Sequence, residues 1–219
     1  MSFEETPWDA IIYGMPTFEI DHSESDLEQA IRRPGHYTVR VDPLVDKRLL
    51  HAYGFYYCDT LIEPSCTSER FRFSDHPDFT AGPCYSVDEL IGIGHGAFSH
   101  GRFHRDFNLD RDLADLRYDR WLENLQKEGK VLGLYRGEEL CGFIGHSGGK
   151  LLLHALEESS RGKGYGKYFW SAACRKIFDQ GEKEISSSIS ASNLAVLNLY
   201  ASLGFRFGHA TDIYHLLVK

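Results

Sequence analysis

Several features of secreted, membrane-bound and nucleic-acid-binding proteins are missing from this sequence. The five cysteines are odd in number and form no Cys-x-x-Cys pair, so we expect reduced thiols and a cytoplasmic protein. The N-terminus has neither the basic stretch nor the apolar core of an export signal, and no run approaches the roughly 18 apolar residues of a membrane-spanning helix. Lysine and arginine form no dense run and the formal charge is −8, so neither nucleic acid nor membrane is an expected partner.

The composition indicates a folded chain that needs no disulfide or metal for its stability. Apolar residues make up 42% and charged residues 26% of the 219 positions, without the apolar depletion that marks disorder. A chain of this length buries roughly 70% of its unfolded surface on folding. We therefore expect one large domain or two small ones.

A glycine-rich segment after an apolar run is the most informative motif. The apolar run, residues 151–156, has the composition of a buried strand, and a helical pattern follows the glycines. Such a turn directs backbone N–H groups and the positive end of the helix dipole toward one point, which favours an anion such as a pyrophosphate. The predicted anion-binding residues are Arg161, Gly162, Lys163, Gly164, Tyr165 and Gly166.

Two common phosphate-binding motifs do not fit this segment. A P-loop requires a lysine followed by serine or threonine, whereas Lys163 is followed by Gly164. A dinucleotide-binding fold places its glycine-rich turn after the first strand of the domain, whereas this turn comes late in the chain. The context therefore has to identify the anion.

The residues that follow predict a helix, a strand-like stretch and a second helix. Apolar residues recur every three or four positions over 165–177, isoleucines alternate with serines over 185–189, and a short helix over 193–203 is closed by Gly204. The order Arg-Gly-x-Gly-x-Gly, helix, strand, Asn…Ala…Leu-Tyr…Gly-Phe resembles the GNAT acetyltransferase superfamily over residues 130–219. The resemblance implies acetyl-CoA as the acetyl donor and co-substrate.

The upstream residues complete the predicted fold. Strands over 131–135, 140–146 and 151–156 form an antiparallel meander. Before them, the capping box of Ser86 and Glu89 opens a helix that extends to Phe98, and a second helix runs through residues 113–125. We predict an α/β (α+β) fold, a GNAT-like mixed central β-sheet flanked by helices, with an N-terminal strand-helix-strand subdomain.

The N-terminal subdomain contains a strand over 37–41 and a helix over 45–53, followed by Gly-Phe and a second strand. The same pattern recurs at 190–205, so either a degenerate half-GNAT unit or ordinary helix C-cap chemistry explains it. Residues 64–83, rich in Ser, Thr, Pro, Asp and Gly, are interpreted as a connector. The predicted division is 1–80 for the subdomain and 81–219 for the acetyltransferase domain.

The segment between residues 97 and 124 resembles, more narrowly, the dTDP-fucosamine acetyltransferases. That resemblance implies that the acceptor is the amino group of a nucleotide-linked amino-deoxysugar. Guanidinium groups suit its diphosphate, and aromatic faces suit the base or sugar. The expected acceptor-binding residues are Arg102, His104, Arg105, Tyr118 and Trp121.

Acetyl transfer requires an oxyanion donor, a proton acceptor and a group that stabilises the departing thiolate. By family position, the oxyanion donor is the backbone N–H of Leu156, and Tyr200 donates toward the sulfur of CoA. Glu157, Glu158 and His154 are candidate bases. Asn193 either caps its helix or, as the resemblance implies, also contacts the pantetheine arm.

Other interpretations stay open. The acceptor is alternatively a polyamine, amino acid or peptide amine, and the chain is alternatively a non-catalytic acyl-CoA-binding module. A homodimer is also left open. His95, His100 and His104 lie close together in the sequence, and His100 and His104 are four apart. A zinc site would need a third ligand and a supporting second shell, and the surrounding loop is glycine-rich and irregular, so no metal is predicted.

Overall fold

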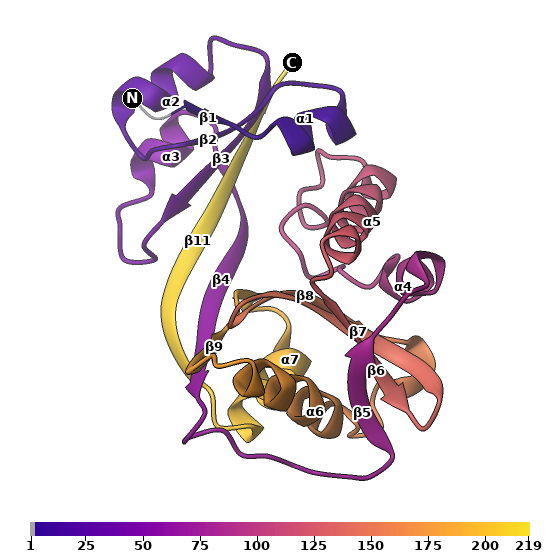
Figure 1. Cartoon of the computed structure of the whole chain (residues 1–219). Helices are drawn as coiled ribbons and strands as arrows, with labels where there is room; N and C mark the ends of the chain where they lie inside the picture. The colour runs from indigo at the N-terminus through magenta and orange to yellow at the C-terminus, as the bar shows by residue number, and fades with distance from the viewer. Residues whose placement is uncertain (1–2) are drawn as a thin grey trace.

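Eleven strands form one continuous sheet in the computed structural model, which describes residues 3–219 (Figure 1). The strands are β1 (Phe3–Glu5), β2 (Thr17–Ile20), β3 (Gly35–Val41), β4 (Tyr56–Thr67), β5 (Phe79–Pro83), β6 (Val131–Arg136), β7 (Glu139–Ser147), β8 (Lys150–Leu156), β9 (Glu184–Ser186), β10 (Ile189–Ser190) and β11 (Arg206–Val218). Their order is β1-β2-β3-β11-β4-β9-β8-β7-β6-β5, and β10 pairs with β4. The pairs β2–β3 and β8–β9 are parallel and the others antiparallel, so the predicted mixed sheet is confirmed.

Seven α-helices and one 3-10 turn accompany this sheet within residues 3–219. They are α1 (Pro7–Tyr13), α2 (Glu24–Ala30), α3 (Arg48–Ala52), α4 (Val87–Gly94), α5 (Arg111–Lys127), η1 (Glu158–Ser160), α6 (Gly166–Asp179) and α7 (Leu194–Ser202). Ser86 begins α4 by accepting the N–H of Glu89, and Asp110 begins α5 in the same way with Asp112. None of these helices is both long and apolar enough to cross a membrane.

The buried side chains form separate layers on the sheet. The largest cluster, which includes Phe169 and Ile177, packs α6 and α7 against the sheet. A second cluster around Leu122 and Phe143 packs α4 and α5 against β7 and β8. A third, around Leu50, covers the N-terminal strands with α2 and α3.

The antiparallel meander of β6, β7 and β8 confirms the prediction, whereas the connector over residues 64–83 was predicted too long. Strand β4 continues to Thr67, and β5 begins at Phe79. Pro64 is tolerated in β4 because it lies opposite Phe207, where the β4–β11 register shifts and a missing N–H does not interrupt the ladder. Helix α4 ends at Gly94 rather than Phe98, and α3 is shorter than predicted.

The N-terminal part and the rest of the chain share the sheet rather than forming two sheets. The long strands β4 and β11 run antiparallel along each other through both halves of the molecule (Figure 1). The turns that precede them are alike: Phe55 N–H donates to Leu50 at 2.9 Å, and Phe205 N–H donates to Tyr200 at 3.0 Å. Both turns contain a glycine of positive φ, 81° and 92°. The domain division and the duplication remain predictions.

Candidate active site

One wall of the candidate site is the edge of β8, at a gap where β9 no longer pairs with it. The two strands pair only at Lys150 and Ser186, and they separate beyond that point. Glu157 N–H donates to Cys141 of β7 at 2.8 Å, and N–H directions alternate along a strand, so the N–H of Leu156 points away from β7 toward the gap. Leu156 is thus placed as an oxyanion donor requires, although its role remains a prediction.

The glycine-rich loop lies at the end of the same gap. Gly162 and Gly164 have φ values of 72° and 76°, which favour glycine. Helix α6 begins at Gly166, and the first N–H groups of a helix have no partner within it. Arg161 folds back so that its Nε donates to the carbonyl oxygen of Leu156 at 2.8 Å. Lys163 is exposed but does not line the cleft described below.

A single large cleft joins the gap, the glycine-rich loop and the surface of α5. Its volume is about 1760 Å³. Leu156, Arg161, Gly162, Gly164, Tyr165, Gly166 and Asn193 line its donor half, and Arg102, Tyr118 and Trp121 line the other half. The structure therefore brings most of the predicted donor-binding and acceptor-binding residues to one cavity.

Asn193 occupies the N-cap position of α7. Its Oδ1 accepts the N–H of Val196 at 3.3 Å, which confirms capping as one of its roles. The residue also lines the cleft, so a contact with the pantetheine arm remains a prediction.

Tyr200 is fully buried and is absent from the residues that line the cleft. Its hydroxyl lies 3.4 Å from Nε2 of His154, which does line the cleft. Burial raises the pKa of the Tyr200 phenol and lowers the pKa of His154 to about 4, so both groups are neutral at physiological pH. His154 is therefore a poor candidate for the base, because its protonated form is disfavoured.

The side chains of Glu157 and Glu158 lie outside the set that lines the cleft. Neither residue lines it, and the Oε2 atom of Glu157 accepts a hydrogen bond from Ser159 at 2.7 Å. Glu157 precedes the 3-10 turn η1, which begins at Glu158. The structure thus gives no support to either residue as the base.

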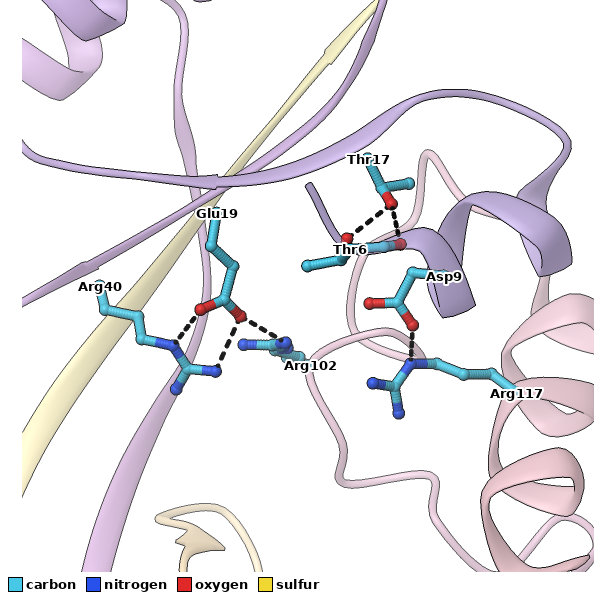
Figure 2. Close-up of polar contacts among 7 residues, drawn as sticks. All are labelled: Thr6, Asp9, Thr17, Glu19, Arg40, Arg102 and Arg117. Atoms are coloured by element: carbon cyan, nitrogen blue, oxygen red, sulfur yellow. Dashed lines mark hydrogen bonds and ion pairs between the residues drawn. The ribbon is translucent and has the colours of Figure 1, made fainter. Parts of the chain in front are cut away.

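The N-terminal strands supply the opposite wall of the acceptor half. Glu19 of β2 lies between two guanidinium groups (Figure 2). Arg40 of β3 donates to it from Nε and Nη2 at 3.2 and 3.1 Å, and Arg102 donates from Nη2 at 3.2 Å. The group carries two positive charges against one negative charge. The Nη1 atom of Arg102 is buried and has no hydrogen-bond partner among residues 3–219.

A second ion pair joins α1 to α5. Nε of Arg117 donates to Asp9 at 2.6 Å (Figure 2). Thr17 Oγ1 donates to the carbonyl oxygen of Thr6 at 2.8 Å, which ties the start of α1 to β2 and so fixes Asp9. Two further predicted acceptor residues, His104 and Arg105, do not line the cleft.

These two residues are instead held by carboxylates. Nε2 of His104 lies 2.8 Å from Asp115, and Nη1 of Arg105 donates to Asp59 at 2.5 Å. Their prediction as acceptor-binding residues is therefore not supported, because neither side chain lines the cleft and each contacts a carboxylate of the protein instead. Asp59, Glu19 and Asp9 were not predicted from the sequence, although a charged residue directly after Tyr56-Tyr57-Cys58 was a signal for Asp59.

The histidines considered for a metal have separate partners. His95 pairs with Asp119 at 2.8 Å, and His100 with Ser192 at 3.2 Å. Within the described residues, one other group of potential ligands lies close together: His36, Asp106 and His215. Both imidazoles hydrogen-bond to the same oxygen of Asp106, at 3.0 and 2.8 Å, so hydrogen bonds already account for their contacting atoms.

The fold is similar to that of several solved proteins. The GCN5-related N-acetyltransferase from Sphaerobacter thermophilus superposes with a TM-score of 0.60 at 12% identity, over 85% of this chain and 61% of that one. A functionally unknown conserved protein from Staphylococcus epidermidis superposes with a TM-score of 0.67 at 11% identity, over 100% and 93% of the two chains. At these identities the likenesses show the fold alone.

Sequence comparison extends this result. Mycothiol acetyltransferase of Renibacterium salmoninarum is 25% identical over 134 residues, which cover 57% of this chain and 38% of that protein. The chain thus spans well under half the length of this curated relative. The sequence profile of the acetyltransferase (GNAT) family matches residues 96–205, half of the chain. Together with the fold, this match shows that the chain belongs to the GNAT family of acetyltransferases.

Proposed function

We propose that the protein transfers the acetyl group of acetyl-CoA to the primary amine of a small molecule. The observation that carries this proposal is that the glycine-rich loop and Leu156 line one cleft. The glycine-rich loop at the start of α6 suits the pyrophosphate of CoA, and the N–H of Leu156 suits the carbonyl oxygen of the thioester.

The cleft has room for both substrates. A pocket for one small ligand commonly measures about 300–1,000 Å³, whereas this cleft measures about 1760 Å³. With the donor along the loop and the β8 edge, the space between the N-terminal strands and α5 is left for the acceptor.

For the acceptor, we propose a nucleotide-linked amino-deoxysugar of the dTDP-fucosamine type. The excess positive charge of the Glu19, Arg40 and Arg102 group and the unpartnered Nη1 atom of Arg102 support an anionic acceptor, and a diphosphate offers several oxygens to such donors. Tyr118 and Trp121 line the same half and offer aromatic faces. A cationic polyamine fits this excess charge less well.

The test is incubation with acetyl-CoA and a panel of amines. A dTDP-linked amino sugar, the free amino sugar, an α-amino acid and a polyamine would be compared by thiol release and by the mass of the product. We expect the nucleotide sugar to give the highest kcat/KM. Equal rates with the free sugar would contradict the anionic acceptor, and CoA binding without turnover on any amine would favour the non-catalytic module.

The donor site makes a separate prediction. Gly164→Val should raise the KM for acetyl-CoA about 5- to 30-fold, because positive φ costs an L-residue about 1–2 kcal/mol and the loop would shift its N–H groups. Gly137→Val is the matched control: Gly137 has φ 60° and equally open surroundings, but lies in the β6–β7 turn and does not line the cleft. An unchanged KM in Gly164→Val would exclude the loop as the pyrophosphate site.

A further inference from the structure

A chain of hydrogen bonds links the α4–α5 connection to β4 through the start of α7. Nδ1 of His100 lies 3.2 Å from Oγ of Ser192, which lies 2.8 Å from Oγ of Ser190. Ser190 donates to Oδ1 of Asp59 at 2.7 Å. His100, Ser190 and Asp59 are among the residues that line the cleft, and the hydrogen bonds run from the exposed His100 to the fully buried Asp59.

The number of hydrogens that each group carries sets the direction of these hydrogen bonds. Asp59 is an acceptor and its Oδ1 also receives hydrogen bonds from Arg105 and the N–H of Thr60, so Ser190 uses its single hydroxyl hydrogen on Asp59. Ser192 must then donate to Ser190. The remaining bond needs a hydrogen on Nδ1 of His100, which leaves a lone pair on Nε2 of the neutral ring.

The backbone next to His100 is held by close packing of its neighbours against Tyr118. A Cβ atom at Gly101 would lie 2.2 Å from the hydroxyl of Tyr118, so only glycine lets the connection approach α5 this closely. Phe98 stacks on the same Tyr118 ring with centroids 4.6 Å apart. The His100 side chain itself is exposed, so a ligand in the cleft can reach Nε2.

We propose that Nε2 of His100 removes the proton from the ammonium group of the acceptor, and that Ser192, Ser190 and Asp59 are positioning residues for it. This inference rests on the proposed function and names the proton acceptor that the proposed acetyl transfer requires. The neutral amine then attacks the thioester carbon, the C–N bond forms and the C–S bond breaks with its electron pair on sulfur. The thiolate takes the second proton from nitrogen, and His100 returns the first to solvent.

Charged groups around the chain favour this role. Asp59 is fully buried, and its carboxylate stabilises the imidazolium through the two serines. Arg105 and Arg102 are the cations that act on Asp59, and burial is the main cause that raises the pKa of its carboxyl.

His100→Gln is the first test. The side chain is exposed and does not pack in the core, so the melting temperature should not change. The value of kcat/KM should fall about 10²- to 10³-fold at neutral pH. In this variant, kcat/KM should keep rising with pH up to the pKa of the acceptor amine, whereas the wild type levels off at lower pH. His209→Gln, an exposed histidine on β11 away from the cleft, should leave both readouts unchanged.

The second test does not depend on turnover. Long-range ¹H–¹⁵N NMR of the wild type should show neutral His100 protonated on Nδ1, and Ser192→Ala should return it to the Nε2–H tautomer. The Nε2–H tautomer in the wild type would overturn the proposal, as would unchanged kcat/KM and pH profile in His100→Gln. If no amine is acetylated, the proposed function fails. The NMR result still shows in which direction the hydrogen bonds between His100 and Asp59 run.

Discussion

Asp106→Ala should lower the stability of the protein by about 3–5 kcal/mol, the loss that follows when one partner of a buried charged group is removed. The carboxylate of Asp106 is buried and bonded to His36 of β3, His215 of β11 and Tyr56 of β4. Without it, two buried imidazoles and a phenol lose their shared partner. For a chain of this length, the corresponding fall in melting temperature is about 6–20 °C.

This cluster also ties the α4–α5 connection to the sheet, so its loss should weaken the acceptor half of the cleft. Asp46→Ala is the control, since Asp46 forms an exposed pair with Arg48, which contributes little to stability. The measurements are thermal unfolding by calorimetry and by circular dichroism. A melting temperature within about 2 °C of the wild type for Asp106→Ala would show that the cluster is dispensable.

Tyr200→Phe should lower kcat about 10- to 100-fold with little change in the KM for acetyl-CoA. A hydrogen bond to a developing charge contributes about 1.5–3 kcal/mol, and each 1.4 kcal/mol corresponds to a factor of ten in rate. The hydroxyl is placed beside His154, which lines the cleft, so the two side chains together can serve the departing thiolate. Because burial raises the pKa of Tyr200, we expect hydrogen bonding rather than full proton transfer.

The variant should fold normally, since the ring keeps its contact with Phe205, whose centroid lies 4.5 Å away. Tyr37→Phe is the matched control: Tyr37 is equally buried, but its hydroxyl donates to Arg33 outside the cleft. Its kcat should equal that of the wild type. Steady-state kinetics with both substrates varied would show the effect, and an unchanged kcat in Tyr200→Phe would remove the residue from the mechanism.

Local chemistry explains which parts of the fold were predictable. The loop around Gly162 and Gly164, the N-cap at Asn193 and the meander of β6 to β8 depend on backbone conformation and periodicity within a few residues. The N-terminal elements β1, α1, β2 and α2 were missed. They are short, and the partners that stabilise them, such as Arg117 for Asp9, lie far away in the sequence.

The candidate site, too, was predictable from the sequence only in part. By itself, the sequence determined the glycine-rich turn and so predicted the donor side, because a turn of this kind between a strand and a helix favours an anion through its own backbone. Only the tertiary structure decided the acceptor side and the candidate base. Asp59 and Ser190 are 131 positions apart, and Arg102 and Glu19 are 83 apart, so their contacts exist only once β10 pairs with β4 and the α4–α5 connection lies against β2. Long-range pairing of buried charges leaves no periodic signal, whereas a turn carries its geometry in the residues that form it.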